Sequence, residues 1–190
     1  MKTYLSPIFL SLFLLTTPCL PGHAQEEKPK EPATKLEAFL AKTGTLFVKD
    51  FYNLGKIRGL GTIELKALVT YQPGQETLTI HGLTIEVTEA GRLEFSGTSF
   101  LDLEEIESLS KAIAYMLDLS EKWKDTDKEY TEVIFLTKGY FKAGFYQKGT
   151  KQQAFASSGY IAGRTCGLSM NDLASLKALV DQGAALLATK

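Results

Sequence analysis

Cysteine and histidine are scarce in this chain, with two residues of each among 190. So few of these ligands exclude dense Cys/His metal sites and the disulfide frameworks of many small secreted domains. The net charge is −1, whereas most nucleic-acid-binding proteins carry an excess of basic residues. Gly-x-Ser-x-Gly, His-Glu-x-x-His and phosphate-loop motifs are missing as well. The sequence therefore assigns no catalytic residue, metal or cofactor, and we expect none.

Residues 1–24 have the layout of a secretory signal peptide. A lysine precedes an apolar run over residues 8–15, and small residues precede a cleavage point after Ala24. The run is too short to span a bilayer, which takes about 20 residues. Lipidation of Cys19 is the alternative, but Pro18 stands where a lipoprotein signal has a small residue. We expect cleavage after Ala24, a periplasmic or secreted product, and no transmembrane segment in it.

The chain after the cleavage point divides into a polar leader and a folded part. Residues 25–35 carry six charges and two prolines but no large apolar side chain. They bury too little surface to offset the entropy of ordering them, so we predict a flexible tether. Residues 36–190 are predicted to form a single α+β domain, with halves at 36–124 and 130–190.

Apolar periodicity predicts strands followed by a helix in the first half. Alternating residues and turn signals indicate four strands in meander order between residues 45 and 101. The alternation changes phase at His81 and Gly82, which suggests a bulge. Asp102 is then a good helix N-cap, with Glu105 three residues later as in a capping box. One apolar stripe continues this helix toward Trp123: Ile106, Leu109, Ile113, Met116 and Leu117.

The second half repeats this scheme, with strand-like segments up to Leu168 and a helix capped by Ser169. The two strand-to-helix junctions align at an offset of 67 residues, where Leu101, Ser108 and Leu109 have identical counterparts. An internal β4α repeat and a chance match both explain this alignment. The fold class is therefore α+β: two antiparallel β-meanders of about four strands, each followed by an amphipathic helix. This order is similar to the plan of some single-strand nucleic-acid-binding folds, without a shared motif.

Charges are unevenly distributed. Residues 86–132 contain 13 acids against five bases, whereas residues 133–171 contain five bases and no acid. Such asymmetry in a nearly neutral chain points to an anionic partner for the basic segment.

Tyrosine and lysine alternate within the basic segment. Tyr140, Lys142, Tyr146 and Lys148 share one predicted strand face, opposite the apolar residues from Phe141 to Phe145. This pattern suits stacking on a sugar or base beside an anionic group. The alternative is an ordinary solvated sheet face, in which the rings pack under the lysine stems.

Two other groups of residues have both a chemical and a structural interpretation. Cys166 precedes a predicted helix, which favours a reactive thiolate, yet free cysteines are most often buried. His81 is its only candidate partner in the chain after the signal. Four acids between Asp102 and Glu107 invite a calcium site, but acids at a helix N-terminus also stabilise the helix dipole. We favour the structural interpretation for both groups.

Together, these features predict an exported, non-enzymatic binding or structural module of the cell envelope or extracellular space. A first alternative is a binder of an anionic polymer or headgroup that uses the Tyr/Lys face. A second is an unrecognised enzyme built on Cys166. The expected partner is accordingly an anionic polymer or another envelope protein.

Overall fold

The computed structural model describes residues 31–160 and 163–190. The predicted signal peptide and the first residues of the predicted tether lie outside the described residues. Eleven elements follow one another along the chain: α1 (Lys35–Leu40), β1 (Val48–Gly59), β2 (Gly61–Tyr71), β3 (Ile80–Glu89), β4 (Ser96–Asp102), α2 (Leu103–Trp123), β5 (Lys128–Leu136), β6 (Lys142–Gly149), β7 (Lys151–Ser158), β8 (Arg164–Leu168) and α3 (Met170–Leu187).

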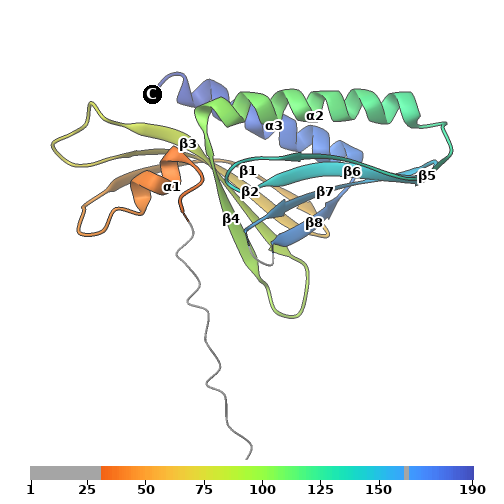
Figure 1. The fold of residues 1–190 in the computed structure, drawn as a ribbon, viewed down its shortest axis with the longest axis horizontal. Coiled ribbons are helices and arrows are strands. Elements are labelled where there is room, and N and C mark those ends of the chain that lie inside the picture. The colour runs from red at the N-terminus through yellow and green to blue at the C-terminus, as the bar shows by residue number, and fades with distance from the viewer. Residues whose placement is uncertain (1–30, 161–162) are drawn as a thin grey trace, which may run out of the picture. The chain divides into compact units, whose positions relative to one another are not determined.

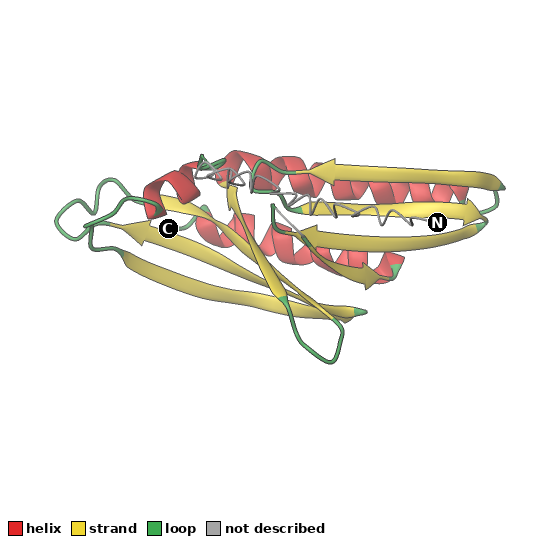
Figure 2. Cartoon of the chain, turned by 60° about the horizontal axis from the view of Figure 1, so that its bottom comes forward, coloured by secondary structure: helices red, strands yellow, loops and turns green. Residues whose placement is uncertain are grey.

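The strands form two four-stranded antiparallel sheets in meander order, β1-β2-β3-β4 and β5-β6-β7-β8. A helix follows each sheet, so the predicted α+β class with two meanders is confirmed. Figure 1 shows α2 and α3 side by side along one side of both sheets, and Figure 2 shows the same helix layer behind the strands. Neither these helices nor α1 combines the length and apolar character needed to cross a membrane, within the described residues.

Local signals correctly placed both long helices. Glu105 accepts a hydrogen bond from the Asp102 amide at 3.3 Å, and Ser169 caps α3 in a box with Asp172. The predicted stripe is buried through Ile106, Leu109, Ile113 and Met116. These side chains join those of α3 and the inner faces of both sheets in one hydrophobic core.

The predicted bulge at His81 and Gly82 is wrong. Strand β3 pairs in continuous register with β2 and β4 through both residues, and the register shift lies in β1 near Gly55 instead. The phase change arises because α1 covers the outer face at this end of β3, so both faces of the strand take apolar residues. A Cβ on Gly82 would lie 2.3 Å from the Leu101 carbonyl oxygen and 3.2 Å from the Leu36 side chain. The glycine therefore marks a close approach.

The two sheets pack against each other through their inner faces, where β7 and β8 of the second sheet contact β2, β3 and β4 of the first. The Ser158 hydroxyl, fully buried, bonds to Ser99 Oγ at 2.6 Å and donates to the Ile85 carbonyl at 3.2 Å. At the edge of the contact, the Leu60 amide donates to the Gly167 carbonyl at 2.8 Å. Helix α3 packs back onto β1 and β2 of the first sheet. The outer faces of both sheets are thereby left to solvent, except where α1 lies.

Helix α1 begins at Lys35, the last residue that the sequence assigned to the tether. Thr34 is buried and caps the helix by accepting from the Glu37 amide at 3.0 Å. The Lys35 and Leu36 amides donate to the Asp102 carboxylate at 2.8 and 3.1 Å. Residues 34 and 35 thus belong to the folded part, because Thr34 caps α1 and the distant Asp102 carboxylate accepts the Lys35 amide.

Candidate functional site

The candidate site is the outer face of the second sheet. It is made of the side chains that alternate with the buried ones of β5 to β8. Phe141, Ala143 and Phe145 point inward and are fully buried, as predicted. The opposite side consists of Tyr130, Glu132, Ile134 and Leu136 of β5, Lys142, Gly144, Tyr146 and Lys148 of β6, Lys151, Gln153, Phe155 and Ser157 of β7, and Thr165 and Gly167 of β8.

Three of the four residues predicted to bind a ligand lie on this face. Lys142 and Lys148 are exposed and Tyr146 is half-buried between them on β6. Tyr140 lies elsewhere, in the turn before β6, where its φ of 62° interrupts the alternation. Its ring meets that of Tyr160 edge-on at a centroid distance of 4.5 Å. The structure therefore brings together Lys142, Tyr146 and Lys148 but not Tyr140.

The acid-free segment does not produce an acid-free surface. Strand β5 comes from the acidic part of the chain and places Glu132 directly opposite Tyr146. The Tyr130 ring lies 5.9 Å from that of Tyr146, and its hydroxyl hydrogen-bonds to the Glu132 carboxylate. This hydrogen bond raises the pKa of Tyr130. The charge asymmetry along the sequence is therefore partly cancelled across the sheet.

An apolar row crosses the whole face, and sequence reasoning missed it. Ile134 stands opposite Gly144, Gly144 opposite Phe155, and Phe155 opposite Gly167. The bridge to Leu60 extends the row by one position beyond β8. Four steps between neighbouring backbones span roughly 19 Å. Ile134 is 47% exposed and Leu60 is 71% exposed.

One signal in the sequence could have revealed part of this row. From Val133 to Leu136, four consecutive apolar residues occupy both faces of β5, which an ordinary half-solvated strand does not need. Leu60 offered no such signal, because it reaches the row only through a bridge between the two sheets.

Cys166 and His81, the residues considered for thiol chemistry, lie apart. Cys166 is fully buried, and burial raises the pKa of its thiol. A Cβ on Gly61 would lie 3.4 Å from its sulfur, which places Cys166 at the end of β3 where Glu89 pairs with Gly61. His81 is eight residues away on β3, or roughly 26 Å along the strand. A thiol that is buried and protonated is the opposite of an activated nucleophile.

The acids around the start of α2 are engaged with backbone amides. The Asp102 carboxylate accepts hydrogen bonds from the amides of Lys35 and Leu36, and the Glu105 carboxylate accepts one from the Lys138 amide at 2.6 Å. Glu104 pairs with the Lys35 ammonium at 2.7 Å. Across residues 31–160 and 163–190, no group of three or more His, Cys, Asp or Glu side chains is placed to hold a metal ion.

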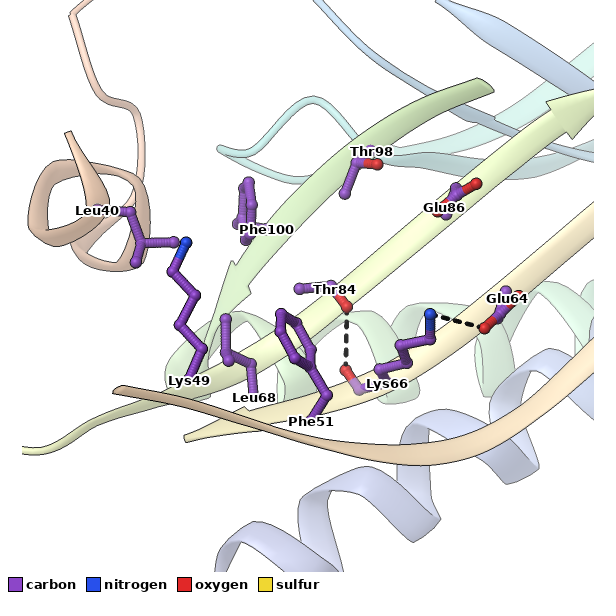
Figure 3. Close-up of a pocket in the computed structure, with 10 residues that line it drawn as sticks. All are labelled: Leu40, Lys49, Phe51, Glu64, Lys66, Leu68, Thr84, Glu86, Thr98 and Phe100. Carbon is purple, nitrogen blue, oxygen red and sulfur yellow. Dashed lines mark hydrogen bonds and ion pairs between the residues drawn. The ribbon is translucent and has the colours of Figure 1, made fainter. Parts of the chain in front are cut away.

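A second surface feature is a groove on the outer face of the first sheet, with a volume of about 240 Å³. It lies between the sheet and Leu40 of α1 (Figure 3).

Comparison of the chain with models of protein families, with curated proteins and with solved structures found no match.

Proposed function

We propose that the protein is an exported, non-enzymatic binding module that holds another protein of the envelope against the outer face of its second sheet. The observation that carries this proposal is the apolar row that runs from the exposed Ile134 through the half-buried Phe155 to the exposed Leu60. Contiguous apolar surface of this kind on a soluble protein commonly marks an interaction site. Export is supported by the signal-like layout of residues 1–24.

The composition of the face suits a protein partner. Interface centres are poor in charge and rich in tyrosine and phenylalanine, and their rims are polar. Here the row from Ile134 through Phe155 to Leu60 crosses the face without a charged side chain, while Lys142 and Lys148 lie to its two sides along β6. The partner should therefore present an apolar ridge with carboxylates beside it, because those carboxylates would meet the two lysines.

Photo-crosslinking from defined positions tests the proposal. A photoreactive residue is placed at Leu60, at Ile134 or, as the control, at Leu93, which is 70% exposed on the β3–β4 connection and thus matches Leu60. We expect positions 60 and 134 to capture the same protein in the organism that makes this chain, and position 93 not to. Binding of that purified protein should weaken at least tenfold in Ile134→Ser and stay unchanged in Leu93→Ser, as expected for an apolar anchor at an interface centre. Equal capture at all three positions would contradict the proposal.

Binding of an anionic polymer is the second candidate, and the position of Tyr146 between Lys142 and Lys148 favours it. Retention on immobilised dextran sulfate should then fall with salt, and Lys142→Glu should reduce both retention and its salt dependence. Tyr146→Ala should weaken retention even at high salt, because stacking is not screened. Glu132 opposes this function, since it lies against Tyr146. Retention that is unaffected by either substitution would exclude the polymer.

A further inference from the structure

The groove on the outer face of the first sheet has two chemically different ends. At one end, Phe51, Leu68 and Phe100 from three strands surround the space below Leu40 of α1. At the other end, Glu64, Lys66 and Glu86 come from β2 and β3 (Figure 3). The sheet register sets this division, because Phe51 pairs with Leu68 and Glu64 pairs with Glu86 farther along.

The apolar end exposes an aromatic ring that the fold leaves uncovered. Phe51 is 54% exposed although Leu68 beside it is fully buried. An exposed phenylalanine over a buried leucine leaves apolar surface in water that an apolar ligand group would cover. Small-molecule sites typically combine such a lining with a few polar groups that fix the orientation of the ligand.

The charges of the groove define that orientation. Within the described residues, the ion pairs of this face join Glu64 to Lys66 at 2.8 Å and to Lys56 at 3.3 Å. Lys49, which is exposed, extends its ammonium toward Leu40 at the rim of the apolar end (Figure 3). Lys49 joins no ion pair among the described residues, whereas Lys66 and Lys56 at the other end already pair with Glu64, and Glu86 adds a further negative charge there. Lys49 is therefore the cation to which an anionic head would be attracted most strongly.

We propose that this groove binds a small single-chain amphiphile, with its anionic head on Lys49 and its chain between Phe51 and Phe100 over Leu68. The apolar end is short, since its apolar lining consists of Leu40, Phe51, Leu68 and Phe100 before the charged end begins. We therefore test it with chains of at most eight carbons. Because it lies on the other sheet, this site is separate from the face proposed to hold a protein.

Calorimetric titration of the purified protein with chosen probes tests the site. The probes are octanoate, octyl phosphate, octylammonium and butyrate. We expect octanoate or octyl phosphate to bind, and octylammonium to bind at least fivefold more weakly, because its head has the wrong sign for Lys49. Butyrate should bind at least tenfold more weakly than octanoate, since each methylene removed from contact lowers the affinity a few fold. A preference between the two anions tells a carboxylate ligand from a phosphate one.

Matched variants locate the binding. Lys49→Gln should weaken the preferred anion about fivefold, whereas Lys151→Gln, an exposed lysine on β7, should not. Phe51→Ala should weaken binding of the preferred anion about tenfold. Phe95, which is 48% exposed, lies outside the groove, so Phe95→Ala should leave this binding unchanged. The proposal is overturned if no eight-carbon probe binds, if octylammonium binds as well as octanoate, or if Lys49→Gln has no effect. Crosslinking at Ile134 should persist in Lys49→Gln, so failure here is distinguishable from failure of the proposed function.

Discussion

Removal of the Asp102 carboxylate should release α1 from the first sheet. Asp102 is only 3% exposed and caps α2 in a box with Glu105. Its Oδ2 accepts from the Lys35 amide at 2.8 Å and its Oδ1 accepts from the Leu36 amide at 3.1 Å. One carboxylate thus holds the first turn of a helix that lies 67 residues away in the sequence.

The magnitude follows from the groups left unpaired by Asp102→Ala. Loss of an N-cap side chain costs about 1 kcal/mol. Each buried amide left without an acceptor costs about 1–3 kcal/mol, and the low end applies because α1 is short and can move until water reaches its amides. We therefore expect a loss of about 3 kcal/mol in the free energy of unfolding. Asp102→Asn keeps one acceptor oxygen and a good cap, so it should lose about 1–2 kcal/mol.

Urea unfolding at pH 7, followed by the fluorescence of the single tryptophan, Trp123, and by circular dichroism, measures these losses. Glu104→Gln is the control, because this exposed carboxylate in the same helical turn pairs only at the surface with Lys35. It should cost less than about 1 kcal/mol. Amide exchange at Leu36 should accelerate in Asp102→Ala and not in the control. The reasoning is refuted if Asp102→Ala and Glu104→Gln unfold within about 0.5 kcal/mol of each other.

Three further predictions concern the core and one ion pair. Leu109→Ala should lose about 2–5 kcal/mol in urea unfolding, because Leu109 is fully buried in the shared core, and a loss below about 0.5 kcal/mol would be a surface value. Cys166, whose thiol pKa is raised by burial, should react with an aromatic disulfide only as fast as the protein unfolds; prompt reaction in the native state would contradict its burial. The hydrogen bond from Lys66 lowers the pKa of Glu64, so Glu64 contributes stability above its unfolded pKa of about 4.3 that disappears as pH falls through the folded value. Glu64→Gln should therefore cost about 0.5–1 kcal/mol at pH 7 and progressively less as the pH falls below about 4, and a cost that does not change with pH would show that the ion pair is not its origin.

Elements defined by neighbouring residues could be predicted from the sequence. Asp102 and Ser169 each lie three residues from the acid that completes their capping box, and the stripe through Leu109 lies within one helix, so local spacing was sufficient to predict them. The alternation around Phe141 to Phe145 likewise assigned the buried face of β6 correctly. The meander order followed because short turns join consecutive antiparallel strands.

Features that depend on distant residues could not be predicted in this way. The attachment of α1 was not predicted, because it depends on hydrogen bonds from the Lys35 and Leu36 amides to Asp102, which is distant in the sequence. The binding face was interpreted as purely basic, because the sequence does not show that Glu132 will pair opposite Tyr146. The groove beside Phe51 arises only when α1 lies over the first sheet, and that contact again depends on residue 102. The missed parts of the candidate sites therefore share one cause, which is pairing between segments far apart in the chain.

The two glycines of the apolar row, Gly144 and Gly167, differ in what a side chain at their position would disturb. A Cβ on Gly144 would lie 2.4 Å from the Val133 carbonyl oxygen, so the backbone of β5 itself excludes a side chain there. A Cβ on Gly167 would lie 3.2 Å from Cδ1 of Leu60, an exposed side chain that can turn away. Glycine within a strand costs roughly 0.5–1 kcal/mol relative to alanine. Gly167→Ala should therefore leave the free energy of unfolding unchanged or slightly higher, while it displaces Leu60 and weakens binding of the crosslinked partner several fold. If Gly167→Ala leaves that binding unchanged, Leu60 does not belong to the binding surface and the row ends at Phe155.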